Sequence, residues 1–229
     1  MSFEFLSVDA ANDGAIARSS VERALLAAGA RLEVRDGWAV AVDYGSVDDE
    51  VRACTEAAGI AESSAMGKLE LQGPRAALAE LAPADLAPGR AAQADGAWWC
   101  PVHRERTLVL CPPGATAELR ESLAGTSLVE VTTGYAAFTV VGPAAREILA
   151  RLCALDTRPS QFAERGFAPV SVGRVPAMVL REDSDRFVVL FGSAYADYMW
   201  TAVTDAGFGL GASVVGTAAL ERTGEAVGA

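Results

Sequence analysis

Residues 37–74 decide the fold, and they read GWAVAVDYGSVDDEVRACTEAAGIAESSAMGKLELQGP. The apolar run 38–42 ends in turn residues, which predicts a strand. Ser46 precedes acidic residues and an apolar repeat at helical spacing, which predicts a helix that begins there and stops at Gly59. The alternation over 66–71 predicts a half-buried strand, closed by a Gly-Pro turn. The stretch therefore predicts strand, helix and strand.

The same strand, Gly-Pro turn and helix recur farther along the chain. The sequence LELQGPRAAL at 69–78 is echoed by FTVVGPAAREIL at 138–149, where Gly supplies the unusual backbone and Pro starts the helix. A strand over 186–191 and a helix over 194–206 form a third unit. This mixture, without regular βαβ spacing, predicts the α+β fold class.

Other segments are expected to be simpler. Helices are predicted over 19–28, 75–81 and 116–123, a strand over 107–111, an irregular connection over 82–97, and a small, apolar tail over 207–219 that frays from Glu221 onward.

Composition excludes some classes of function. The chain has 229 residues, of which 51% are hydrophobic, and a formal net charge of -11. Such acidity argues against nucleic acid and anionic membranes as partners, because both are bound through Lys and Arg. No stretch approaches a membrane span, and residues 1–20 lack a signal-peptide pattern. Four scattered cysteines predict free thiols in a reducing compartment, hence a cytoplasmic protein: Cys54, Cys100, Cys111 and Cys153.

The opening stretch also carries a family resemblance. Gly37-Trp38, Tyr44-Gly45-Ser46, Ala58-Gly59-Ile60 and Ser64-x-Met66, in this order before Gly73-Pro74, resemble the amino-terminal part of the folate-binding aminomethyltransferase superfamily. This superfamily includes the glycine cleavage T-protein and the small γ subunit of heterotetrameric sarcosine oxidase. The resemblance covers roughly the whole chain but not the carboxy-terminal barrel domain of full T-proteins. It implies a two-lobed α+β fold, with residues 1–65 and 126–229 in a discontinuous first lobe and 66–125 in an inserted lobe.

The resemblance implies that tetrahydrofolate lies in a central hole between the lobes. An Asp of the family lies near the pterin, where a carboxylate can stabilise a cationic iminium or ammonium. Counting back from the strand at 107–110 places this catalytic residue near Asp95. The alternative is that Asp95 is a turn residue before Gly96, since Asp-Gly is a common turn dipeptide.

Further cofactor contacts follow from the same resemblance. A family acid that holds the pterin ring corresponds to Glu182 or Asp183, for which the alternative is a solvated hairpin tip. Tyr135 is expected to stack on the ring, unless it belongs to the core. Met66, at the end of the matched motif, is a further contact. Glu62 stands where the family has an Asp, and this departure counts against folate chemistry.

No metal site is expected. His103 and Cys100 form a Cys-x-x-His pattern, but a zinc site needs further ligands that do not cluster nearby.

Three hypotheses about function remain open. The first is a tetrahydrofolate-linked one-carbon transfer protein of the T-protein type, acting on a small amine or related metabolite. The second is a non-catalytic subunit, like the sarcosine oxidase γ subunit, that binds a larger flavoprotein. The third is a folate-independent enzyme that uses the same pocket for another small molecule. The first is preferred because folate binding is the main use of the fold.

Overall fold

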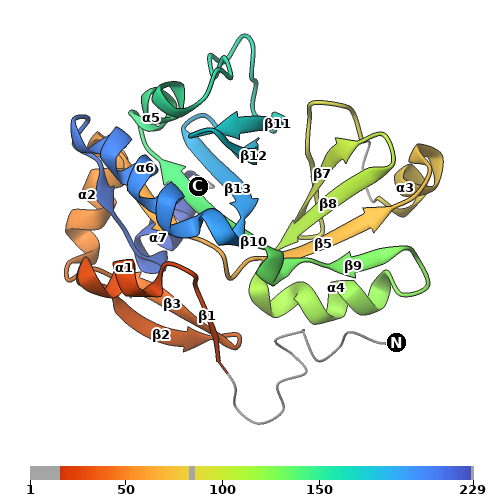
Figure 1. Cartoon of the computed structure of the whole chain (residues 1–229), viewed down its shortest axis with the longest axis horizontal. Coiled ribbons are helices and arrows are strands. Elements are labelled where there is room, and N and C mark those ends of the chain that lie inside the picture. Colours follow the sequence, from red (N-terminus) through yellow and green to blue (C-terminus); the bar gives the residue numbers. More distant parts are fainter. Residues whose placement is uncertain (1–15, 83–85, 228–229) are drawn as a thin grey trace.

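Three β-sheets with helices packed against them make up the fold, and the computed structural model describes residues 16–82 and 86–227 of the chain (Figure 1). This arrangement confirms the α+β class. The helices are α1 (Glu22–Ala27), α2 (Val47–Glu56), α3 (Arg75–Leu81), α4 (Thr116–Ser122), α5 (Ala145–Leu152), α6 (Ala196–Phe208) and α7 (Thr217–Val227).

The sheets have three, six and five strands. The first has the order β1 (Ala17–Arg18), β3 (Trp38–Asp43), β2 (Arg31–Arg35). The second has the order β11 (Phe167–Val172), β12 (Val175–Arg181), β13 (Arg186–Gly192), β10 (Tyr135–Val141), β4 (Gly59–Glu62), β14 (Ser213–Val214). The third has the order β6 (Ala92–Ala94), β7 (Ala97–His103), β8 (Arg106–Cys111), β5 (Gly67–Gln72), β9 (Leu128–Glu130).

Residues 37–74 give one strand to each sheet, namely β3, β4 and β5. The predicted helix between the first two is α2, and Ser46 caps it by accepting a hydrogen bond from the Asp49 N–H at 3.3 Å. The prediction missed β4. Helix α2 ends at Glu56, and Gly59 begins a strand instead of closing the helix.

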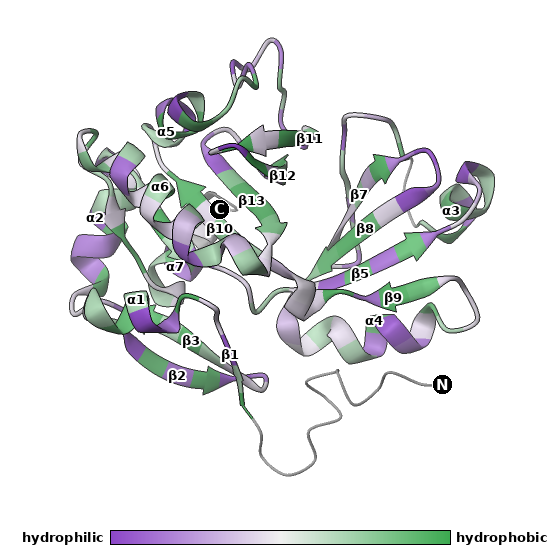
Figure 2. Ribbon diagram, in the orientation of Figure 1, coloured by the Kyte–Doolittle hydropathy of each residue, from purple (hydrophilic) through white to green (hydrophobic). Residues whose placement is uncertain are grey.

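The largest apolar core lies between the six-stranded sheet and helices α5 and α6. At its centre the Phe138 ring meets Phe191 and Trp200 edge-on, with centroids 4.9 and 5.4 Å apart. A second core fills the space between the six- and five-stranded sheets and includes Cys100 and Leu180. Figure 2 shows apolar residues running along β8 and β13.

Three predictions about local structure were wrong. Strand β5 is buried on both faces up to Leu71, so it is not half-buried. The segment predicted to be irregular contains β6 and the beginning of β7, and the tail predicted to fray forms α7. Helix α7 forms because it packs on α2 and β3, where Ala219 and Leu220 are buried. Such tertiary packing overrides weak local propensity.

The five-stranded sheet is built from residues 67–130, whereas the inserted lobe was predicted over 66–125. The three-stranded sheet takes its strands from before this segment, and the six-stranded sheet takes strands from both sides of it. The division into two lobes stays a prediction.

Candidate functional site

The three sheets meet at the segment that leads from β4 to β5, residues 62–68, here called the crossing segment. Charged side chains almost never lie fully buried unless they are paired. Yet Glu62 is 7% exposed and Lys68 is 0% exposed. The crossing segment therefore departs from an ordinary core, because it buries an acid and an amine.

The Glu62 carboxylate ties the crossing segment to Ser19, the residue that follows β1. Its Oε1 accepts hydrogen bonds from the Ser19 hydroxyl at 2.9 Å and from the Ser64 N–H at 3.0 Å. Burial raises the pKa of Glu62, against the lowering effect of the hydrogen bonds from Ser64 and Ser19 and of the nearby Lys68.

The Lys68 amine folds back onto the crossing segment. Its Nζ donates to the carbonyls of Ser64 and Met66, both at 2.8 Å, and lies 3.4 Å from the Thr132 carbonyl. Burial lowers the pKa of Lys68 to about 7, although Glu62 and Cys111 both favour the charged form. Lys68 is the only lysine of the sequence.

Two further hydrogen bonds join the crossing segment to its neighbours. The Ser64 hydroxyl accepts from the Ala137 N–H of β10 at 3.0 Å, and the Thr132 hydroxyl accepts from the Lys68 N–H at 3.1 Å. The Tyr44 hydroxyl is buried without a hydrogen-bond partner, and burial together with the nearby Glu62 and Glu50 raises its pKa. Chemically, this arrangement offers a buried acid and a buried amine, both held by hydrogen bonds, and a buried hydroxyl without a partner.

Beside the crossing segment, an incompletely covered apolar surface lies between the six- and five-stranded sheets; we call it the seam. Its partly buried side chains all pack on the second core: Met66, Trp98, Val102, Val131 and Tyr135. The Arg106 guanidinium donates to the Tyr135 hydroxyl at 2.9 Å and pairs with Glu70 at 2.6 Å. Glu70 also accepts from the Gln72 amide at 2.7 Å, so this carboxylate is already engaged on both oxygens.

The structure brings together only two of the four predicted cofactor contacts, Met66 and Tyr135, which pack on the same core. Tyr135 pairs with Gly192 at one end of β10, whereas Glu182 and Asp183 follow β12 beyond the other end, where Val141 pairs with Arg186. Six residue steps along a strand separate these ends by about 20 Å. One pterin ring cannot contact both.

The two acids lie between β12 and β13, where both are partly buried. Glu182 accepts a hydrogen bond from the Arg186 Nε at 2.8 Å, and Asp183 accepts one from the Asp185 N–H at 3.1 Å. Asp95 lies in the exposed turn between β6 and β7, with a left-handed backbone (φ 50°), and Gly96 follows it. The catalytic role of Asp95 and the pterin contacts of these acids stay predictions.

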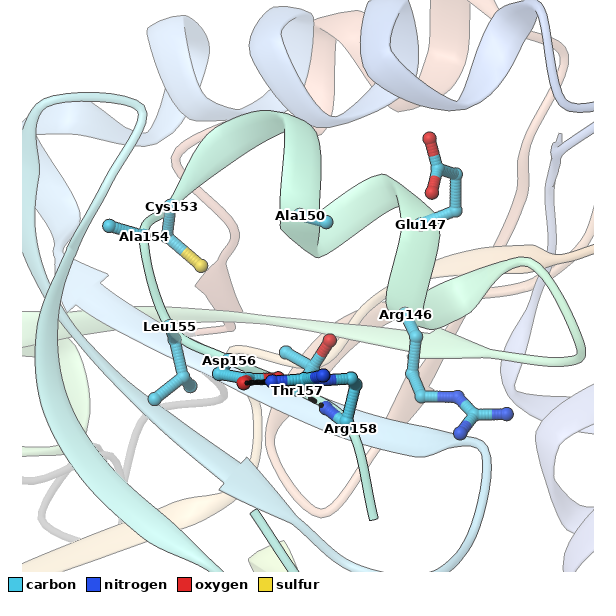
Figure 3. A pocket seen from close by; sticks show the side chains of 9 residues that line it. All are labelled: Arg146, Glu147, Ala150, Cys153, Ala154, Leu155, Asp156, Thr157 and Arg158. Carbon is cyan, nitrogen blue, oxygen red and sulfur yellow. Dashed lines mark hydrogen bonds and ion pairs between the residues drawn. The ribbon is translucent and has the colours of Figure 1, made fainter. Parts of the chain in front are cut away.

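A separate pocket of about 430 Å³ lies between α5 and the segment after it (Figure 3). Its charges are largely compensated within the chain. Arg158 pairs with Asp156, and Glu147 pairs with Arg151. The rest of the lining is mostly small or apolar and includes Cys153, Ala150 and Leu155.

The four cysteines are free, as predicted: Cys54, Cys100 and Cys111 are buried, and Cys153 is partly exposed. Burial raises the pKa of each thiol, so none is activated as a nucleophile. Cys100 is buried and His103 is exposed on the same strand.

Comparison with known proteins indicates which protein family the chain resembles. The GCVT N-terminal domain model matches residues 112–223. The chain is 30% identical over 208 residues to an aminomethyltransferase of Symbiobacterium thermophilum, covering 78% of this chain and 55% of that protein. It is 32% identical over 219 residues to a probable aminomethyltransferase of Natronomonas pharaonis, covering 81% of this chain and 58% of that protein. These matches support the aminomethyltransferase superfamily as the family that the chain resembles. It spans little more than half the length of these relatives.

Solved structures of the aminomethyltransferase superfamily show the same fold. The glycine cleavage aminomethyltransferase T of Bartonella henselae matches with a TM-score of 0.71 at 17% identity, over 89% of this chain and 60% of that one. A chain of heterotetrameric sarcosine oxidase from Corynebacterium sp. U-96 matches with a TM-score of 0.61 at 18% identity, over 74% of this chain and 95% of that one. Within residues 16–82 and 86–227, none of the helices is both long and apolar enough to cross a membrane.

The sequence did not predict that Glu62 and Lys68 are buried near each other. The only signal was positional, because Glu62 occupies the acid position of the superfamily motif and was treated there as a departure. Lys68 gave no signal, because a lysine in an alternating strand is ordinarily on the exposed face.

Proposed function

We propose that this chain binds tetrahydrofolate at the seam and takes part in one-carbon transfer to or from a small amine, as the relatives' name aminomethyltransferase suggests. The observation that carries the proposal is the seam itself. There, Met66, Trp98 and Tyr135 present partly exposed apolar side chains between two sheets of a fold shared with aminomethyltransferases. Aromatic and thioether side chains suit the faces of a flat heterocycle.

The polar edge of the ring is less well matched. Glu70 is the carboxylate beside Tyr135, and Arg106 and Gln72 already occupy its oxygens. The seam residues therefore fit the faces of a pterin and would hold its edge through Arg106, whose side chain is 34% exposed. Reduced folate, when bound, would supply the nitrogen that accepts the one-carbon unit.

Titration with tetrahydrofolate, followed by Trp fluorescence and melting temperature, tests this proposal. Ligand at 100 times its dissociation constant should stabilise the chain by about 2.7 kcal/mol. Tyr135→Ala should weaken binding by about 2- to 13-fold, since stacking on an aromatic ring contributes roughly 0.5–1.5 kcal/mol. Tyr195→Ala is the matched control, because Tyr195 is 49% exposed on the six-stranded-sheet side and lies outside the seam. Equal affinity in both variants would contradict the seam as the site.

A second candidate is a non-catalytic subunit that binds a flavoprotein. It is supported by the match to 95% of a sarcosine oxidase chain, against 55% and 58% of the aminomethyltransferases. Co-expression with flavoprotein subunits encoded beside it, followed by size-exclusion chromatography, tests this candidate. If a stable flavin-containing complex forms and folate does not shift the melting temperature, the subunit proposal replaces the first one. A folate-independent enzyme is expected to give neither result.

A further inference from the structure

Lys68 joins two segments that both carry side chains of the seam. Its Nζ donates to the Ser64 and Met66 carbonyls of the crossing segment, both at 2.8 Å, and to the Thr132 carbonyl at 3.4 Å. Its backbone reaches the same second segment, because its N–H donates to the Thr132 hydroxyl at 3.1 Å and its carbonyl accepts from the Val131 N–H at 2.9 Å. Since Met66 and Val131 both belong to the seam, one residue ties two of its sides together.

The second segment leads directly to another seam residue. It runs from Val131 through the short helical turn Thr132–Gly134 to Tyr135, the first residue of β10. The crossing segment contacts the same strand, since the Ser64 hydroxyl accepts from the Ala137 N–H at 3.0 Å. The hydrogen bonds around Lys68 therefore fix the crossing segment against the start of β10.

Lys68 itself does not reach the surface of the seam. It is 0% exposed, so a ligand bound there would not touch it. Burying an amine is costly unless hydrogen bonds compensate for the lost water. An apolar side chain of similar length would fill the space but would leave the three carbonyls without this donor. The amine thus stabilises one particular arrangement of the backbone around it.

We propose that Lys68 is a positioning residue of the seam. Through the three carbonyls it sets where Met66 lies relative to Tyr135, and thereby how well a flat heterocycle fits between them. This inference rests on the proposed binding of tetrahydrofolate at the seam. It adds that the affinity of the seam depends on an amine that does not contact the ligand.

Rescue of Lys68→Ala by a small amine tests the proposal. The substitution vacates space beside the carbonyls, which methylammonium can enter as an N–H donor; tetramethylammonium has the same charge but no N–H. Tetrahydrofolate affinity, measured by Trp fluorescence, should fall by about tenfold in Lys68→Ala, as expected for the loss of a buried donor. Methylammonium should restore most of this affinity, whereas tetramethylammonium should restore none.

The neighbouring residue Leu69 supplies the matched control. It is also 0% exposed, but it packs in a different apolar cluster, because successive side chains of a strand face opposite sides of the sheet. Leu69→Ala should therefore keep the tetrahydrofolate affinity within about twofold and should not respond to methylammonium.

The position of Met66 can be followed without any folate. The chain has only four methionines, so NMR of protein labelled with carbon-13 at the methionine methyl groups gives few signals, and Met66→Leu assigns the one that matters. In Lys68→Ala the Met66 signal should shift, and methylammonium should return it to its wild-type position. Met199, which is 0% exposed in the largest core, should keep its signal throughout. If the Met66 signal behaves in this way while the wild type does not bind tetrahydrofolate, the proposed function fails and the positioning role of Lys68 stands.

Three outcomes would overturn the inference. One is a Met66 signal that does not change in Lys68→Ala, another is wild-type tetrahydrofolate affinity in that variant, and the third is a loss that methylammonium does not restore or that both salts restore equally. If Lys68→Ala does not fold, Lys68→Met takes its place, because it keeps an unbranched stem and lacks only the donor. It should show the same change at Met66 and the same loss of affinity, without rescue, since the stem fills the space. Wild-type behaviour in Lys68→Met would likewise overturn the inference.

Discussion

Two parts of the molecule share one sequence pattern and use it differently. In both, a buried central strand turns at Gly-Pro into a short helix: β5, Gly73-Pro74 and α3 form the first unit, and β10, Gly142-Pro143 and α5 form the second. Strand β10 buries an almost wholly apolar sequence around Phe138, whereas β5 buries Lys68 and Glu70. The second unit thus contributes mainly to the largest core, whereas the first unit begins at the crossing segment and buries charged side chains.

The two glycines show the same contrast. A Cβ at Gly142 would lie 2.4 Å from the Cys54 carbonyl oxygen and 2.8 Å from that of Ala57, and its φ is 117°. A Cβ at Gly73 would meet nothing closer than the Leu78 side chain at 4.0 Å. A shared motif therefore predicts a shared turn, but it does not predict which turn is tightly packed.

Replacing the tightly packed glycine should have the largest effect. Gly142→Ala is expected to lower the free energy of unfolding by at least about 5 kcal/mol, because a backbone clash and a left-handed φ act together. Gly73→Ala, the matched control, should cost about 1 kcal/mol. Urea unfolding measures both. Similar losses at the two positions would remove the contrast between the two turns.

The next effect compares the two strands. Phe138→Ala should cost about 4 kcal/mol, since it leaves a cavity beside Phe191 and Trp200 in the largest core. Leu69→Ala on β5, also 0% exposed, should cost about 2–3 kcal/mol because its core cluster is smaller. A larger loss at Leu69, measured by calorimetry, would mean that the first unit carries more of the stability than its packing indicates.

A third prediction concerns pH. The folded pKa of Lys68 lies below its unfolded value, so the unfolded chain binds more protons between the two values. Stability should therefore rise with pH from about 7 to 10, by up to about 1.4 kcal/mol per pH unit. In Lys68→Met this rise should be absent. The free energy of unfolding is measured for both proteins across this pH range. If the difference between them does not change with pH, Lys68 is not uncharged in the folded protein.

The smallest effect on stability is expected in the exposed turn. Asp95→Asn should change the free energy of unfolding by less than about 0.5 kcal/mol, because Asn also tolerates a left-handed backbone. Its effect on catalysis is the informative part. If Asp95 is the predicted catalytic carboxylate, tetrahydrofolate-dependent turnover should be lost while the melting temperature is kept. Unchanged turnover would refute that role.

Much of the fold was predictable because the local sequence signals for caps and turns agree with the observed helices and strands. Ser46 caps α2, Gly29 ends the first helix with a positive φ, and α3 covers the predicted residues 75–81. Strand β4 was missed because Gly and Ala dominate it, and these residues gain strand structure only from pairing with β10. Helix α7 was missed for a similar reason, since its packing partners lie more than 150 residues earlier in the chain.

The site was harder to predict than the fold. Met66 and Tyr135 both pack on the second core, but Tyr135 and Glu182 lie beyond opposite ends of the paired strands of the six-stranded sheet. This separation follows from strand register and not from motif order. The burial of Glu62 and Lys68 depends on Ser19 and Thr132, which are more than 40 residues away along the chain. Sequence spacing does not report such contacts.

The most direct test of the account is a crystal structure of the chain grown with tetrahydrofolate. Electron density for the pterin ring is expected at the seam, in contact with Met66 and Tyr135, with the crossing segment unchanged. Density for the ring elsewhere, such as in the pocket beside α5, would contradict binding at the seam. A seam closed by its own side chains at saturating ligand would contradict it too.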